Sequence, residues 1–220
     1  MSSLNRNTPS QPLIGVLALQ GDFAEHIHML GKIGVHAVEV RKVEQLFEID
    51  GLIIPGGEST TIVKLLMRFG FVDQLRSRVE SGMALWGTCA GMIVIARELT
   101  DSYPTPLNLL DIGVSRNYFG RQVDSFEAEI DIEGIDGEAM RAVFIRAPVV
   151  SDVGDGVVKI ASLDDGQAVA VKKGRVLASS FHPELTTDTR MHSLFVELAR
   201  EGQIDTLNPT RNAEEISNTA

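Results

Sequence analysis

The segment from Trp86 to Gly91 limits the folds open to this chain more than any other part of the sequence. It reads Trp-Gly-Thr-Cys-Ala-Gly and stands between the apolar run 83–86 and a helical pattern. A sharp strand-to-helix turn strains the backbone, so the residues two before and two after its apex must be very small. Gly87 and Gly91 meet that requirement. The segment therefore predicts a nucleophile elbow with Cys89 at its apex.

The first half of the chain alternates between strand-like and helix-like segments. Apolar runs of strand length with few polar interruptions are typical of parallel strands covered on both faces. The alternation predicts a three-layer α/β fold with a largely parallel sheet. The expected strands are 13–19, 37–40, 52–54 and 83–86, and the expected helices are 23–33, 59–69, 72–80 and 90–98.

The second half is richer in short β-like runs and ends in one helix. Lys173-Gly174 has the composition of a tight hairpin turn between two of these runs. The closing helix is expected over 188–200, where Met191, Leu194, Phe195 and Leu198 share a face. The expected strands are 112–116, 126–132, 142–145, 157–161, 168–171 and 176–180.

Composition bounds the kind of protein. With 220 residues, 44% of them hydrophobic, the chain suits one domain, expected at 13–202 between a flexible N-terminal tail at 1–12 and a polar C-terminal tail at 203–220. The net charge of −10 argues against nucleic-acid binding. Its longest apolar stretch, about 14 residues, is shorter than the roughly 20 of a membrane span. One cysteine and no recognisable signal peptide predict a cytoplasmic protein.

Cys89 is the candidate nucleophile. The turn projects its sulfur from the carboxyl end of the sheet and sets it at a helix N-terminus, which favours the thiolate. The backbone N–H of Ala90 is then placed to stabilise an oxyanion. A lone cysteine is usually a small core residue. A core cysteine does not need the flanking glycines, so they favour the nucleophile.

His182-Pro183-Glu184 directly follows the late strand 176–180 and supplies a candidate base. His182 can accept the thiol proton, and Glu184, on the same side of an extended segment, can orient the imidazole. A histidine near a carboxylate is by itself more often an ordinary surface hydrogen bond. Because the sequence also contains the predicted elbow at Cys89, we favour a catalytic role for this pair. The other histidines lack metal-site spacing, so no metal is predicted.

A second glycine-rich turn, Pro55-Gly-Gly-Glu-Ser-Thr, follows the strand at 52–54 and opens a helix. Turns at the carboxyl ends of neighbouring parallel strands converge on one crevice, so this turn is expected beside Cys89. The amide of Gly57 is then a second candidate for the oxyanion hole. A Gly-Gly pair is also common in ordinary tight turns, and the segment lacks the lysine of a phosphate-binding loop.

These three motifs, in this order on an α/β pattern, resemble the triad-type (class I) glutamine amidotransferases. Three further segments are similar to the glutaminase subunits of pyridoxal 5'-phosphate synthase. They are Leu17-Ala-Leu-Gln-Gly-Asp-Phe-Ala-Glu-His, Arg116-Asn-Tyr-Phe-Gly-Arg-Gln and Phe144-Ile-Arg-Ala-Pro. The likeness covers about 13–202.

The resemblance implies a flavodoxin-like domain with a mixed, mainly parallel sheet. It implies hydrolysis of L-glutamine to glutamate and ammonia through a thioester on Cys89, without a cofactor. It also implies a barrel-shaped synthase subunit as partner, contacted through 19–25, and an oxyanion hole that is incompletely formed in the isolated chain. Carried over by position, the substrate contacts are Gly57, Glu58, Ser59, Arg116, Ile145 and Arg146, while Arg121 is not assigned.

Three alternatives remain open at this point. In the first, the chain is a glutaminase that supplies ammonia to another synthase, and Ser115 to Gln122 is the segment that would discriminate between the synthases. It is a cysteine hydrolase or peptidase on the same fold, which would not be expected to combine the Gly-Gly-Glu-Ser turn with His-Pro-Glu. Or it is a catalytically silent binding module, which the complete set Cys89, His182 and Glu184 disfavours.

Overall fold

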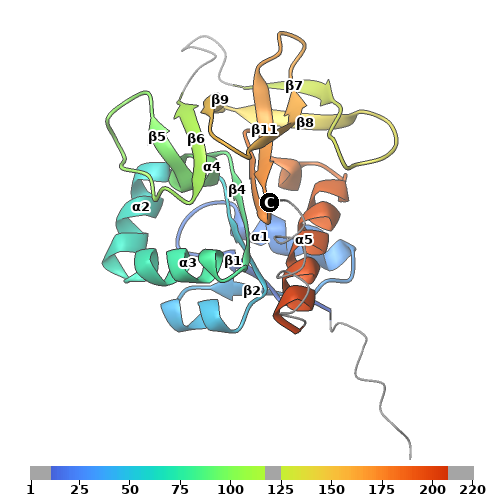
Figure 1. Cartoon of the computed structure of the whole chain (residues 1–220). Coiled ribbons are helices and arrows are strands. Elements are labelled where there is room, and N and C mark those ends of the chain that lie inside the picture. The colour runs from blue at the N-terminus through green and yellow to red at the C-terminus, as the bar shows by residue number, and fades with distance from the viewer. Residues whose placement is uncertain (1–10, 117–124, 208–220) are drawn as a thin grey trace, which may run out of the picture.

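A seven-stranded sheet forms the centre of the protein (Figure 1). The computed structural model describes residues 11–116 and 125–207. The strand order is β10-β11-β12-β4-β3-β1-β2. These strands are β1 (Ile14–Leu17), β2 (Ala37–Val40), β3 (Gly51–Ile54), β4 (Ala84–Thr88), β10 (Val158–Ser162), β11 (Ala168–Lys173) and β12 (Val176–Ser179).

The sheet is mixed but mainly parallel, as predicted. Strands β2, β1, β3, β4 and β12 pair in parallel, whereas β12, β11 and β10 pair antiparallel. Lys173 on β11 lies opposite Val176 on β12, so the predicted hairpin is confirmed, but its two-residue turn is Gly174-Arg175, one position later than expected. The parallel order places the carboxyl ends of β1, β3, β4 and β12 at one edge of the sheet.

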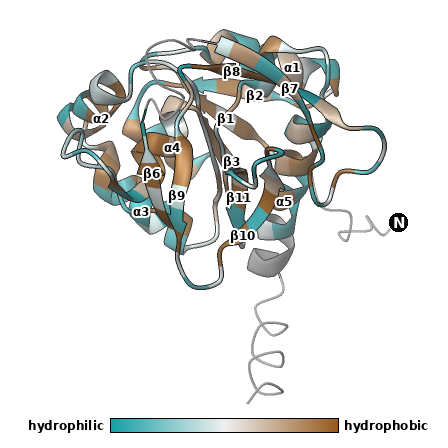
Figure 2. Ribbon diagram, turned by 90° about the horizontal axis from the view of Figure 1, so that it is seen from above, coloured by the Kyte–Doolittle hydropathy of each residue, from teal (hydrophilic) through white to brown (hydrophobic). Residues whose placement is uncertain are grey.

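Helices cover both faces of the sheet and complete three layers. Helices α1 (Phe23–Lys32) and α5 (Arg190–Leu207) lie on one face, and α2 (Ser59–Arg68), α3 (Phe71–Glu80) and α4 (Ala90–Ile95) lie on the other (Figure 1). Successive strand residues serve opposite cores: Ile53 packs with α1 and α5, whereas Leu52 and Ile54 pack with α2, α3 and α4. Burial on both faces explains the nearly continuous apolar runs (Figure 2).

Two smaller β units accompany the central sheet. One is a three-stranded sheet, and the other is an antiparallel hairpin whose second strand ends beside Cys89. Their strands are β5 (Ala96–Leu99), β6 (Leu110–Ser115) and β9 (Val149–Val153) in the sheet, and β7 (Ser125–Ile130) and β8 (Met140–Ile145) in the hairpin.

The predicted helix 90–98 was wrong at its end. Helix α4 stops at Ile95, and the next four residues form β5, in which Ala96 pairs with Leu110. That pairing supplies backbone partners which continuation of the helix would forgo. Strand β9 and the 3-10 helix Val43–Phe47 were not predicted.

The closing helix also differs from the prediction. Helix α5 begins at Arg190 and ends at Leu207, so it continues past the predicted end at 200 and into the segment expected as a polar tail. The four apolar residues that guided the prediction end at Leu198, whereas the helix continues through 199–207. In the part of the chain that the structure describes, every helix is too short or too polar to span a bilayer.

Candidate active site

Cys89 lies at the apex of a strained turn between β4 and α4. Its backbone has φ 46° and ψ −103°, a region that non-glycine residues rarely adopt. The Cys89 N–H donates to the Ser179 carbonyl over 2.8 Å, which ties the turn to β12. A Cβ on Gly87 would lie 2.5 Å from the backbone carbonyl of Gly91. The geometry of a nucleophile elbow is therefore present.

His182 lies next to Cys89 because their strands are neighbours. Thr88 at the end of β4 pairs with Ser179 at the end of β12, so the residues that follow both strands leave the sheet at the same edge. The His182 N–H donates to the Val143 carbonyl over 2.8 Å, which attaches this segment to β8 as well. Residues 93 positions apart in sequence thus meet through strand pairing.

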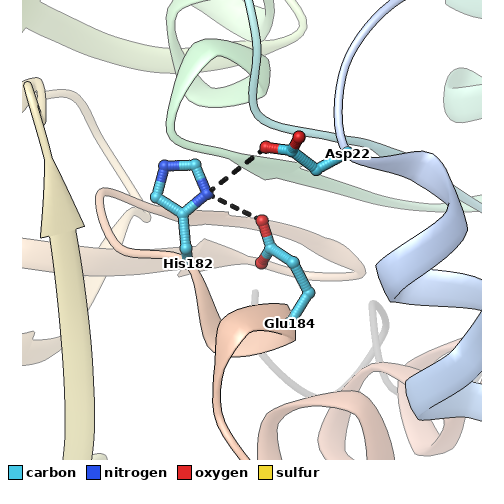
Figure 3. Close-up of side chains that lie close together, drawn as sticks. All are labelled: Asp22, His182 and Glu184. Atoms are coloured by element: carbon cyan, nitrogen blue, oxygen red, sulfur yellow. Dashed lines mark hydrogen bonds and ion pairs between the residues drawn. The ribbon is translucent and has the colours of Figure 1, made fainter.

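Glu184 contacts the imidazole of His182 from behind. Nδ1 of His182 lies 2.7 Å from Oε1 of Glu184, and both side chains are buried (Figure 3). The sequence predicted an extended segment here, and this prediction was wrong. Residues Pro183–Leu185 form a 3-10 turn. The turn folds the carboxylate back toward the ring, so the predicted contact forms by a different backbone path.

The charges at this contact support an ion pair. Burial acts to lower the pKa of His182, but the hydrogen bonds and charges of Cys89 and Glu184 outweigh burial and raise that pKa from 6.5 to about 10. Burial raises the pKa of Glu184, and the hydrogen bond and charge of His182 oppose that shift. A protonated His182 therefore favours the ionised form of the buried Glu184, against the effect of burial.

The glycine-rich loop lies against His182, as the sequence predicted. A Cβ on Gly56 would overlap the His182 ring. The loop is held by the segment after β1: the Asp22 N–H donates to the Gly56 carbonyl over 3.1 Å, and the Glu58 N–H donates to Gln20 Oε1 over 2.7 Å. Gly57 has φ 147°, and a Cβ there would lie 2.6 Å from Gln20 Oε1. Glycine is therefore required at this position.

One pocket, of about 340 Å³, collects the predicted site residues. Only Glu184 lies outside its lining, buried behind His182. The Cys89 sulfur, at its floor, lies 3.8 Å from the Ile145 carbonyl oxygen. The predicted residues in the lining are Gly57, Glu58, Ser59, Cys89, Ala90, Arg116, Ile145, Arg146 and His182.

Two arginines line the pocket. Arg116 follows β6, donates to the Tyr103 carbonyl and lies 3.6 Å from Asp101. Arg146 follows β8 and has φ 43°, again in the left-handed region. Backbone strain of this kind is common at functional sites, where the surrounding structure holds it in place. Arg121 and most of the discriminating segment Ser115 to Gln122 lie outside the described residues.

Sequence reasoning missed three residues of the pocket lining and two buried histidines. Gln20, Asp22 and Ile93 line the pocket, and His26 and His192 lie behind it. Gln20 and Asp22 could have been found, because they follow the first strand at the same sheet edge as Cys89. The two histidines carried no local signal, since each is one polar residue in a helical pattern.

Asp22, His182 and Glu184 also lie close enough together to suggest a metal site (Figure 3). Nδ1 of His182 is 4.0 Å from Asp22 and 2.7 Å from Glu184. A nitrogen that donates a proton to a carboxylate has no lone pair for a metal. The hydrogen-bonded pair therefore accounts for the cluster without an ion.

Comparisons with known proteins agree with this geometry. A profile of the SNO glutamine amidotransferase family matches residues 16–201. The chain is 56% identical over 189 residues to a Dehalococcoides mccartyi protein named pyridoxal 5'-phosphate synthase subunit PdxT, covering 85% of this chain and 97% of that one. It is 52% identical over 198 residues to the Nocardia farcinica protein of the same name, covering 87% and 88%.

Solved structures give the same result. A glutamine amidotransferase crystal structure superposes with a TM-score of 0.80 at 52% identity, covering 84% of this chain and 98% of that one. The structure of PurLQS from Thermotoga maritima, with a TM-score of 0.62 at 17% identity over 90% of this chain and all of that one, shares the fold. The predicted fold class and resemblance are confirmed, and the chain belongs to the SNO glutamine amidotransferase family.

Proposed function

We propose that this protein is the glutaminase subunit of a pyridoxal 5'-phosphate synthase and that Cys89, His182 and Glu184 are its catalytic triad. The observation that carries the proposal is the position of His182. Its ring lies between the elbow cysteine and a buried carboxylate 2.7 Å away, and it lines the pocket. Relatives named pyridoxal 5'-phosphate synthase subunit PdxT support the choice of synthase.

The reaction begins with attack on the side-chain amide of glutamine. Nδ1 of His182 is occupied by Glu184, so Nε2 takes the Cys89 proton, and the thiolate attacks the carboxamide carbon. The N–H of Ala90, which has no acceptor within its helix, and the N–H of Gly57 stabilise the oxyanion. His182 returns the proton to the nitrogen, which leaves as ammonia, and the enzyme retains a thioester.

Water completes the cycle. His182 removes a proton from a water molecule, which attacks the thioester carbon, and the second oxyanion collapses to glutamate. The sulfur leaves as the thiolate and regains its ion pair with His182. The balance is one glutamine and one water consumed, and one glutamate, one ammonia and one proton released.

The charged groups of the pocket match the two ends of the substrate. Glutamine carries an α-carboxylate and an α-ammonium, for which an arginine and a carboxylate are suitable partners. Arg116, Arg146 and Glu58 line the same pocket as Cys89. We propose that they bind these groups, with Ser59 and Ile145 completing the contacts.

The partner follows from the chemistry of the product. Ammonia in water at neutral pH is mostly protonated and is then no nucleophile, so the reaction is useful when the subunit docks on an ammonia-consuming synthase. We propose a barrel-shaped synthase subunit that contacts residues 19–25, beside the pocket. The reactive cysteine must stay reduced, so we propose a cytoplasmic location. We also propose that the activity resides in 13–202 and that the polar ends are not required.

Glutamate release from glutamine tests the proposal. The wild type is compared with Cys89→Ala and His182→Asn, each alone and mixed with a pyridoxal 5'-phosphate synthase subunit. Release by the wild type, stimulated by the synthase and lost in both variants, is expected. Release that rises only with a different synthase would show that the other synthase is the partner. Cleavage of γ-glutamyl peptides without glutaminase activity would overturn the assignment.

A further inference from the structure

A second layer of buried polar side chains lies behind the triad. His26 on α1 and His192 on α5 are completely buried, and neither lines the pocket. Nδ1 of His26 lies 3.0 Å from Nε2 of His192. Nε2 of His26 lies 3.4 Å from Oε2 of Glu184 and 3.3 Å from the Thr88 hydroxyl. The two histidines thus extend the line from Cys89 through His182 and Glu184 into the core.

Oε2 is the unsatisfied oxygen of Glu184. Oε1 accepts the bond from His182, whereas Oε2 is buried and has no hydrogen bond of ordinary geometry within the described residues. An unpaired buried carboxylate oxygen is costly. Nε2 of His26 is the polar atom that the structure places beside this oxygen, 3.4 Å away, and it also lies within hydrogen-bonding distance of the Thr88 hydroxyl.

The hydrogen-bond pattern selects one tautomer for each ring. Of the facing nitrogens, Nδ1 of His26 and Nε2 of His192, one must donate and the other accept. If His26 donates there, its Nε2 turns a lone pair toward Glu184, and His192 keeps a buried Nδ1–H without a partner. If His192 donates, His26 carries its proton on Nε2, between the Thr88 hydroxyl, its hydrogen-bond partner, and the adjacent Oε2 of Glu184. The second arrangement avoids both the lone pair that would face Glu184 and the buried N–H that would lack a partner.

Both rings are neutral, so they act as dipoles. Burial, His192 and His182 lower the pKa of His26, and burial with the charge of Lys32 lowers the pKa of His192 to about 3. Edge-to-face contacts with the Trp86 ring restrict both imidazoles. The titratable or charged groups facing this layer are Asp22, Lys32, His182 and Glu184.

We propose that His26, held in one tautomer by His192, is a positioning residue that donates its Nε2–H to Glu184 and thereby keeps the carboxylate ionised and aimed at His182. The inference rests on the proposed triad. Without this donor, Glu184 becomes easier to protonate, His182 loses the anion that favours its charged form, and the Cys89 thiolate loses its counter-ion.

A matched pair of substitutions separates the N–H donor from the packing of the ring. His26→Gln and His26→Met introduce side chains of nearly equal length and shape, but only glutamine carries an N–H that can reach Glu184. Cys89 is the only cysteine in the chain. The rate of alkylation by iodoacetamide as a function of pH therefore reports the Cys89–His182 ion pair alone and needs neither glutamine nor a synthase.

In His26→Met, the midpoint of the alkylation profile is expected to rise by about one pH unit, and kcat for glutamine hydrolysis to fall about 10- to 100-fold with KM within about twofold. His26→Gln is expected to restore most of both quantities. Identical behaviour of the two variants, whether both resemble the wild type or both are equally impaired, would overturn the proposal.

Two controls complete the experiment. His182→Asn is expected to change the pH profile of alkylation, and an unchanged profile would contradict the triad itself. A profile that changes in His182→Asn but is the same in His26→Gln and His26→Met would contradict only the role of His26. If His26→Met does not fold, His192→Gln and His192→Met provide the same contrast one step further back. A smaller shift of the same sign in His192→Met supports the proposal, and equal profiles refute it.

Discussion

The α-carbon of Gly91 lies so close to Ile54 that a Cβ at position 91 would overlap the Ile54 carbonyl oxygen. The contact joins the first turn of α4 to the end of β3, two elements at the pocket edge of the sheet. Because the obstacle is backbone within a paired strand, it has no room to withdraw. The backbone of the elbow therefore depends on the absence of a side chain.

Gly91→Ala is expected to destabilise the protein by about 3 kcal/mol or more, because α4 must move away from β3. The free energy of unfolding in urea measures the effect. Gly31→Ala is the matched control: Gly31 lies within α1, and its Cβ would meet nothing within 4 Å. That variant should gain about 0.5–1 kcal/mol from helix propensity. Equal effects of the two substitutions would contradict the steric account.

Glu184→Gln should separate activity from stability. The amide retains the shape of the carboxylate but not its charge, so the His182 cation loses its partner and kcat should fall about 10²- to 10⁴-fold. Removing one partner of a buried pair is costly when the other stays charged. His182 can release its proton instead, so the midpoint of thermal unfolding should change little. Glutamate release and circular dichroism check the two effects. Loss of stability in proportion to activity would show that Glu184 is chiefly structural.

Acid should destabilise the protein through the buried histidines. Their pKa values are lowered in the folded state, so below about pH 6.5 the unfolded chain binds protons that the folded chain does not. Stability should therefore fall with pH, by up to about 1.4 kcal/mol per pH unit for each histidine. For His192 the loss continues until its folded pKa of about 3.

His192→Met removes one of the two contributions. Its free energy of unfolding in urea should decline less steeply than that of the wild type between about pH 6.5 and pH 5. The difference in slope, rather than the absolute stability, is the quantity to compare, because the substitution also alters packing. Parallel slopes would mean that His192 is not the neutral buried group described above.

Arg116→Met should act on substrate binding. Loss of a charge-assisted hydrogen bond to the substrate should raise KM for glutamine about 10-fold, with little change in the pH profile of Cys89 alkylation. Arg141→Met is the control, because Arg141 pairs with Glu127 on the β7–β8 hairpin and does not line the pocket. A fall in kcat without a change in KM would exclude the proposed substrate contact.

Local chemistry explains which features the sequence could predict. The elbow at Cys89 and the turn at Gly57 need small residues because of steric contacts within a few positions of the chain, so both can be recognised in the sequence. The hairpin after Lys173 is visible for the same reason. Parallel strands buried on both faces produce long apolar runs, which is why the strands β1, β3 and β4 could be predicted.

Contacts between distant segments explain what was missed. Ala96 begins a strand because Leu110 is available to pair with it, and no residue near Ala96 signals that pairing. His26 and His192 are 166 positions apart, and each is an isolated polar residue in its own helix. Their contact is created by the docking of α1 and α5. The contact of Glu184 with His182 was predicted correctly, but the backbone path that forms it was not, because the 3-10 turn depends on how the chain packs after β12.

The insertion of β12 between β4 and β11 has a consequence for the newly made protein. Translation adds Cys89 to the chain before His182, and the proposed base reaches the proposed nucleophile only when β12 has paired with β4. A chain still on the ribosome, or one cut short before Val176, holds its thiol without the imidazole proposed to activate it. On the proposed mechanism, an unfinished copy therefore cannot hydrolyse glutamine.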